Sequence, residues 1–251
     1  MSGTVYLVGA GPGAADLLTL RAARLLVEAD IVFHDALVSP EILALAAGGE
    51  KIAVGKRCGR HSTAQRFINK RLADAAQAHK VVVRLKGGDP MLFGRAHEEI
   101  RYLVSRGVRV EVVPGVTAAL AASADLGVSL TQRGVARTVV FATPRVAPGA
   151  PANEWLAPVL AADTAAIYMG AGDAQMIAQA LIEAGKAAAT PVAVVENASR
   201  DDVRMLYGTL RQLGALAAEL GEGPAVILLG EVLADAAAVA RRAIPRKAQA
   251  R

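Results

Sequence analysis

The residues that could carry chemistry in this sequence gather around two glycine-rich segments. The first, Gly9-Ala10-Gly11-Pro12-Gly13-Ala14, follows a β-branched run and precedes an apolar stretch with helical spacing. It fits the G-x-G-x-x-G/A pattern of dinucleotide-binding loops, and Asp35 lies about 20 residues on, where such proteins hold the ribose. Pro12 weakens this interpretation because it removes one backbone N–H that would contact a pyrophosphate. A tight turn without a ligand therefore stays open beside nicotinamide-nucleotide binding.

The second segment is Arg84-Leu85-Lys86-Gly87-Gly88-Asp89-Pro90, which follows a run of valines. Its adjacent glycines let the backbone approach a ligand closely. Asp89 could accept hydrogen bonds from a ribose diol or an ammonium group, and it follows a strand at the sheet edge where open α/β folds bind ligands. Because no Gly-Lys-Ser/Thr is present, the segment is not a Walker phosphate loop. It predicts a ligand-binding loop.

Alternating strand and helix patterns must position these loops. Up to Pro114, short apolar runs separated by helical patterns predict a mostly parallel sheet covered on both faces. Strands are expected at Val5–Val8, Ile31–Phe33, Lys51–Val54, Val81–Leu85 and Val108–Val113, and helices at Leu17–Ala29, Pro40–Ala47, Gln65–His79 and Glu98–Arg106.

The pattern changes after Pro114-Gly115, which predicts two α/β domains with mostly parallel or mixed sheets. We expect domains at 1–113 and 114–243, followed by a basic tail at 244–251. The second domain should contain strands at Thr138–Thr143, Ala165–Met169, Pro191–Glu196 and Ala225–Leu229, and helices at Thr117–Leu126, Ala174–Ala184 and, after a loop, within Gly208–Leu220.

Composition limits the classes of function. Of the 251 residues, 53% are hydrophobic and 20% are charged, so a folded core is expected and a disordered tail is excluded. The single cysteine, Cys58, excludes an internal disulfide and a cysteine-rich zinc site, and no metal is expected. The net charge of +5 fits a polyanionic small molecule better than nucleic acid, because aromatic residues make up only 4%. We expect no membrane segment or leader, and a cytoplasmic protein.

A series of motifs, in this order along the chain, resembles the tetrapyrrole (corrin/porphyrin) methylase family. The resemblance runs from about Val5 to Gly230. The motifs are Val8-Gly9-Ala10-Gly11-Pro12-Gly13, Asp35-Ala36-Leu37-Val38-Ser39, Val54-Gly55-Lys56-Arg57, Arg84 to Pro90, Phe93-Gly94-Arg95, Val112 to Ala119, Leu130-Thr131-Gln132-Arg133-Gly134, Tyr168-Met169-Gly170 and Val194-Val195-Glu196-Asn197.

The resemblance implies two α/β domains with S-adenosyl-L-methionine (SAM) in the cleft between them, and a homodimer. It implies a C-methyltransferase that converts uroporphyrinogen III into precorrin-2 by methylation at C2 and C7, in sirohaem or cobalamin biosynthesis, with S-adenosyl-L-homocysteine as the other product. It gives no role to a metal, nucleic acid or membrane.

The resemblance also implies roles for individual residues. Asp35 matches the proton acceptor and Lys56 the proton donor, while Arg95, Glu98 and Arg133 match residues placed around the macrocycle. The positions that match SAM-binding residues are Pro12, Gly87, Gly88, Asp89, Leu92, Thr117, Ala118, Met169 and Ala198. Uroporphyrinogen carries eight carboxylates, which arginine can bind bidentately.

The sequence departs from the usual family pattern at Ala36, Ala96, His97, Gln132 and Arg145, mostly on the side expected to face the tetrapyrrole. Other functions therefore stay open: a precorrin methylase acting on C11, C17 or C20, a weakly catalytic SAM-binding protein, and a nicotinamide oxidoreductase.

Overall fold

The computed structural model describes residues 2–54, 65–146 and 154–236. The chain forms two compact units, Met1–Ala118 and Ala119–Arg251. The expected division into 1–113 and 114–243 stays a prediction, and the expected tail at 244–251 lies outside the described residues. No helix in these described ranges is long and apolar enough to cross a bilayer.

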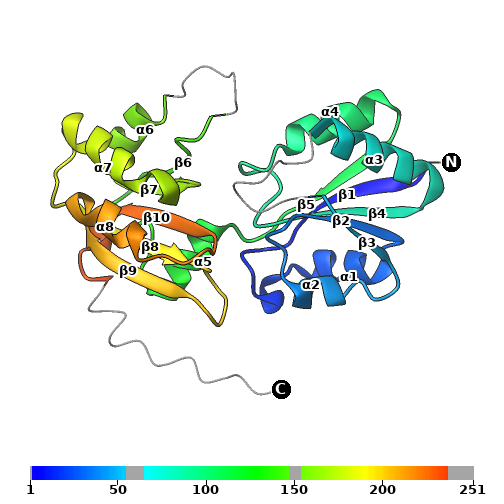
Figure 1. Ribbon diagram of the computed structural model, residues 1–251, viewed down its shortest axis with the longest axis horizontal. Helices are drawn as coiled ribbons and strands as arrows, with labels where there is room; N and C mark the ends of the chain where they lie inside the picture. The colour runs from blue at the N-terminus through cyan, green and yellow to red at the C-terminus, as the bar shows by residue number, and fades with distance from the viewer. Residues whose placement is uncertain (1, 55–64, 147–153, 237–251) are drawn as a thin grey trace. The chain divides into compact units, whose positions relative to one another are not determined.

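The first unit is built on a parallel sheet with the strand order β3-β2-β4-β1-β5. Helices α1 and α2 lie on one face of this sheet, and α3 and α4 lie on the other (Figure 1). The strands are β1 (Thr4–Gly9), β2 (Ile31–His34), β3 (Glu50–Ala53), β4 (Val81–Lys86) and β5 (Arg109–Val113); the helices are η1 (Ala15–Leu17), α1 (Leu20–Glu28), α2 (Pro40–Ala44), α3 (Gln65–Ala78) and α4 (Ala96–Ser105).

Hydroxyl side chains fix where the helices on one face begin. The Thr19 hydroxyl accepts a hydrogen bond from the Ala22 N–H and starts α1 at Leu20, three residues later than the sequence predicts. Ser39 caps α2 in the same way, and Pro40 occupies its first turn. Apolar residues of both helices, among them Leu26 and Ile42, are fully buried against the strands.

The second unit has a mixed sheet with the order β6-β7-β10-β8-β9. Only the β6–β7 pair is parallel among the described strands of this sheet. The strands are β6 (Val139–Ala142), β7 (Thr164–Tyr168), β8 (Pro191–Glu196), β9 (Arg204–Thr209) and β10 (Ala225–Gly230); the helices are α5 (Ala118–Leu126), α6 (Leu156–Ala161), η2 (Ala171–Asp173), α7 (Ala174–Glu183), η3 (Leu210–Gln212), α8 (Leu213–Ala218) and η4 (Glu231–Leu233).

The two sheets and their helices confirm the predicted α/β class. Among the strands and α-helices, the sequence did not predict strand β9, which lies at the edge of its sheet and pairs along its length with β8, or the short helix α6. The residues of β9 show no alternation of buried and exposed positions. Antiparallel pairing with a distant segment, rather than a local pattern, therefore defines this strand.

Candidate functional site

The two glycine-rich loops meet at the carboxyl edge of the parallel sheet. The Gly88 N–H donates to the Gly11 carbonyl oxygen at 2.7 Å, and the Gly11 N–H donates to the Gly88 carbonyl oxygen at 3.2 Å. Gly11 has a φ of +73° and Gly88 a φ of +67°, which glycine adopts without steric strain. The bridge joins the loop after β1 to the loop after β4, as expected where parallel strands end side by side.

A third backbone segment closes on these loops at Gly115, just after β5. A Cβ atom on Gly115 would lie 2.4 Å from the Gly88 carbonyl oxygen and 2.9 Å from the Gly9 Cα. A Cβ atom on Gly9 would meet Gly115 and Gly88 at 2.7 Å. Three chain segments therefore come into direct contact through the backbone of glycines, a convergence that no single motif reveals.

We expect Gly115→Ala to lower the free energy of unfolding by about 1–3 kcal/mol, because rigid backbone must move to admit the methyl group. Gly48→Ala is the matched control, since a Cβ there meets nothing within 4 Å and the backbone is not left-handed. Urea denaturation of both variants measures the difference. Equal midpoints would contradict the close contact.

Asp89 holds this convergence in place. Its Oδ2 accepts the Gly115 N–H at 2.9 Å, and its Oδ1 accepts the Met91 N–H at 2.8 Å. A carboxylate has about four acceptor positions, so two remain for a ligand. The sequence predicts only ligand contacts for Asp89; in the structure the residue also joins the loop after β4 to the loop after β5.

Asp35 follows β2 at the same edge, and its side chain is 28% exposed. One carboxylate oxygen accepts a hydrogen bond from the Arg84 guanidinium. Arg84 lies on β4, where only 3% of its side chain is exposed, and its Nε donates to Glu99 of α4 at 3.2 Å. The sequence alone indicated no role for Arg84 or Glu99, although Arg84 is a charged residue within a strand predicted to be buried.

Lys86 completes a charged cluster that is buried except at Asp35, and we define this buried cluster as Asp35, Arg84, Lys86 and Glu99. Its Nζ contacts both Glu99 carboxylate oxygens, at 3.1 and 3.3 Å. Burial, reinforced by the positive charge of Arg84, lowers the pKa of Lys86 despite the attraction of Glu99. Glu99 has no exposed surface and also accepts a hydrogen bond from Gln65 at 3.0 Å.

Arg95 and Glu98 form an ion pair at the start of α4. The Arg95 guanidinium donates to both Glu98 oxygens, at 2.7 and 2.8 Å, and both side chains are about half exposed. The hydrogen bond from Arg95 lowers the pKa of Glu98. Arg95 has a φ of +57°, a strained conformation for a side chain of this size. The pair is available at the surface, whereas the neighbouring Glu99 points into the core.

In the second unit, Met169 and Ala198 lie at one edge of the mixed sheet. Met169 follows β7 and Ala198 follows β8; both strands run antiparallel to β10, so their carboxyl ends share an edge. Met169 is 42% exposed with a φ of +55°, while Ala198 is buried between Asn197 and Ser199, which also have positive φ. Backbone strain of this kind concentrates at functional sites.

The other predicted residues divide between the units. Pro12, Gly87 and Leu92 lie in partly exposed loops of the first unit, Thr117 is buried near Gly88, and Ala118 begins α5. Arg133 is exposed in a turn of the second unit between the bridged residues Gln132 and Ala136. Lys56 lies outside the described residues.

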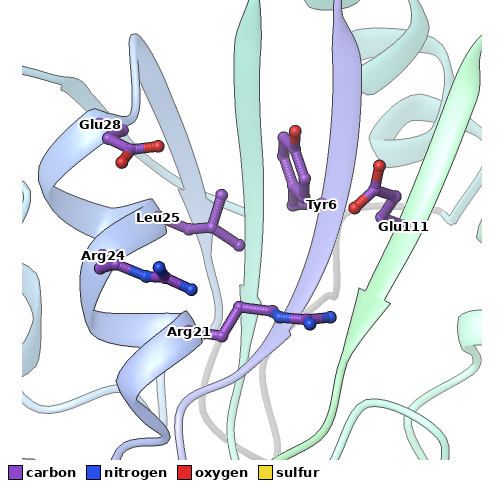
Figure 2. Close-up of a pocket in the computed structure, with 6 residues that line it drawn as sticks. All are labelled: Tyr6, Arg21, Arg24, Leu25, Glu28 and Glu111. Carbon is purple, nitrogen blue, oxygen red and sulfur yellow. The ribbon is translucent and has the colours of Figure 1, made fainter.

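A hollow of about 240 Å³ in the first unit is lined by Tyr6, Arg21, Arg24, Leu25, Glu28 and Glu111 (Figure 2). It lies between α1 and the strands β1 and β5, and none of the predicted site residues lines it. Its two arginines and two glutamates give it no single preferred charge. In the part of the chain that the structure describes, no group of three or more His, Cys, Asp or Glu residues is arranged to hold a metal ion.

Comparison with curated proteins gives close relatives. The chain is 47% identical over 232 residues to siroheme synthase 1 of Yersinia pseudotuberculosis. The aligned region covers 92% of this chain and 49% of that protein. It is 45% identical to siroheme synthase of Chromobacterium violaceum, with 50% of that protein covered. The chain thus spans about half the length of the curated relatives it matches.

Comparison with solved structures gives matches over nearly the whole length of each chain. Uroporphyrin-III C-methyl transferase from Thermus thermophilus, complexed with S-adenyl homocysteine, has a TM-score of 0.81 and 43% identity, with 92% of this chain and 99% of that one covered. A cobalt precorrin-4 methyltransferase has a TM-score of 0.79 and 30% identity, with 92% of this chain and 95% of that one covered. The family model described as Tetrapyrrole (Corrin/Porphyrin) Methylases matches residues 4–214. These findings confirm the resemblance drawn from the sequence motifs, and the chain belongs to the tetrapyrrole methylase family.

Proposed function

We propose that this chain is a SAM-dependent C-methyltransferase that converts uroporphyrinogen III into precorrin-2 by methylation at C2 and C7. The observation that carries the proposal is the 43% identity to the Thermus thermophilus enzyme over 99% of that chain. The siroheme synthases support a role in sirohaem synthesis. We infer further that the chain acts in the cytoplasm as a homodimer, without nucleic-acid or membrane partners.

The loops of the first unit fit the proposed cofactor. A Cβ atom on Gly88 would meet only the Thr117 Cα, at 4.0 Å, so a ligand can approach this backbone closely. In the proposal, the residues that bind SAM are Pro12, Gly87, Gly88, Asp89, Leu92, Thr117, Ala118, Met169 and Ala198. When bound, SAM supplies an electrophilic methyl group on a sulfonium centre.

The charged side chains would act on the tetrapyrrole. A pyrrole carbon that gains a methyl group leaves the macrocycle cationic, and a proton must then be lost. In the proposed mechanism the Asp35 carboxylate accepts that proton, and its partial exposure and its hydrogen bond from Arg84 support this role. Lys56 is the proposed proton donor. Arg95, Glu98 and Arg133 would orient the macrocycle through its carboxylates and pyrrole N–H groups.

The test is incubation of the chain with SAM and enzymatically made uroporphyrinogen III. We expect the absorption spectrum of precorrin-2, with two S-adenosyl-L-homocysteine molecules released per product, and calorimetric binding of S-adenosyl-L-homocysteine but not of NAD. Cofactor binding without methyl transfer would instead indicate a weakly catalytic SAM-binding protein. NAD binding of similar strength would favour the oxidoreductase interpretation.

A second candidate function is methylation of a later precorrin. The similarity to the cobalt precorrin-4 methyltransferase favours it, together with the departures at Ala36 and Gln132. Methyl transfer to a precorrin substrate, with none to uroporphyrinogen III under the same conditions, would select this alternative.

We expect Arg133→Ala to lower kcat/KM for the tetrapyrrole about 10- to 100-fold, the equivalent of one charge-assisted hydrogen-bonded contact. Arg133→Lys should retain only part of the parent's kcat/KM, because an ammonium group cannot reproduce the planar, bidentate guanidinium. S-adenosyl-L-homocysteine affinity should not change in either variant. Arg211→Ala is the control, an exposed arginine of the same unit outside the matching positions. Unchanged kinetics in Arg133→Ala would make Arg133 a surface charge only.

A further inference from the structure

All three guanidinium nitrogens of Arg84 donate hydrogen bonds. Its Nε donates to Glu99 at 3.2 Å, its Nη1 donates to the carbonyl oxygens of Leu85 at 3.1 Å and Phe33 at 3.4 Å, and its Nη2 donates to Asp35. The carbonyls belong to β4 and β2, and Glu99 belongs to α4. Of the four groups that Arg84 contacts, Asp35 is the one that follows a strand at the carboxyl edge and has a partly exposed carboxylate.

Glu99 in turn is fixed by its own neighbours. Lys86 contacts both of its oxygens, and Gln65, at the start of α3, donates to Oε1 while also bonding Asn69. Two helices and a central strand thus converge on one carboxylate with no exposed surface. The position of the Arg84 fork is therefore determined by the packed interior and not by solvent.

Stability alone does not explain these charges. Burying ions has a large desolvation penalty, and apolar residues of similar volume are often as stabilising as a buried ion pair. Apolar side chains such as Leu103, Ile68 and Leu72 form the core on this face of the sheet. The same desolvation lowers the pKa of Lys86, because burial outweighs the attraction of Glu99 at this side chain.

We propose that Arg84 and Glu99 are positioning residues that hold the Asp35 carboxylate in its reactive orientation, with Lys86 fixing Glu99 from the other side. The inference rests on the proposed function of Asp35 as proton acceptor. Neither Arg84 nor Glu99 has to touch the substrate: Glu99 orients Arg84, and Arg84 orients Asp35. A misplaced reacting group can lower a rate about 100-fold, so a buried charge two contacts away can control turnover.

The test is a double-mutant cycle in kcat between Glu99→Gln and Asp35→Asn. Glu99→Gln keeps the shape of the side chain while removing the charge that Arg84 Nε and Lys86 contact. We expect kcat to fall about 10- to 100-fold, with KM for the tetrapyrrole and S-adenosyl-L-homocysteine affinity unchanged. In the Asp35→Asn background, Glu99→Gln should have almost no further effect on kcat, because the residue through which it acts is already disabled.

A second variant keeps the test possible if Glu99→Gln alone does not fold. Lys86→Met combined with Glu99→Gln removes one charge of each sign from the core and leaves Arg84 paired with Asp35. It should show the same non-additivity with Asp35→Asn. Asp74→Asn, which disrupts an exposed ion pair with Lys70 on α3, is the control and should leave kcat unchanged.

If Glu99→Gln lowers kcat by the same factor in the parent and in the Asp35→Asn variant, the two substitutions act independently. That result would overturn the positioning role, even if Asp35→Asn by itself lowers kcat. Full activity in Asp35→Asn would instead overturn the proposed proton acceptor, and the positioning role with it. The two failures are therefore distinguishable.

Discussion

Asp35→Asn should lower the rate of methyl transfer to uroporphyrinogen III on the order of 10²- to 10⁴-fold, the range that a positioned general base supplies. The amide keeps the shape of the carboxylate and can still accept a hydrogen bond from Arg84, but it cannot accept a proton at neutral pH. Arg84 retains Glu99 and two backbone carbonyls as partners, so the fold should persist. Initial rates of S-adenosyl-L-homocysteine release measure the effect.

Cofactor affinity separates a chemical defect from a structural one in this variant. S-adenosyl-L-homocysteine should bind Asp35→Asn as it binds the parent, because the Asp35 side chain contacts Arg84 within β4, whereas the backbone of Gly11 and Gly88 is held by the hydrogen bonds between these two glycines. Asp74→Asn again serves as the control for loss of a carboxylate in the same unit. A rate within about threefold of the parent's would remove Asp35 from the chemistry.

Glu99→Ala should lower the free energy of unfolding by about 3–5 kcal/mol, because it leaves Arg84 and Lys86 buried without the carboxylate that they share. Both cations are almost fully buried, so water cannot replace the lost partner. Urea denaturation measures the change, with Asp74→Ala as the exposed control, whose midpoint should hardly move. A midpoint for Glu99→Ala close to that of the control would contradict the buried cluster.

Lys86→Met should be tolerated far better than Glu99→Ala. The lowered pKa of Lys86 means that burial disfavours its charge more than Glu99 stabilises it, and Glu99 keeps Arg84 and Gln65 as donors in this variant. The folded state also holds the Lys86 proton less tightly than the unfolded state does. Stability should therefore rise with pH between the folded pKa and the ordinary lysine value, and Lys86→Met should lose that rise.

The strand and helix pattern of the first unit could be predicted from the sequence because each element is specified locally. Buried strands appear as β-branched runs, helices as apolar spacing, and loop ends as glycine and proline. The same local signals placed Gly88 and Asp35 after their strands, and parallel strands bring such residues to one edge. Strand β9 lacked a local signal because its pairing with β8 defines it.

The roles of charged residues within the site depended on tertiary structure. Glu98 and Glu99 are adjacent in the sequence and chemically alike, yet Glu98 pairs with Arg95 at the surface and Glu99 lies in the core, where it contacts Arg84 and Lys86. A helix turns about 100° per residue, so neighbours point in different directions, and only packing against α3 and β4 decides which is buried. Likewise, the spacing of Asp89 and Gly115 does not reveal the hydrogen bond that joins their loops, because that contact exists only when three strands end together.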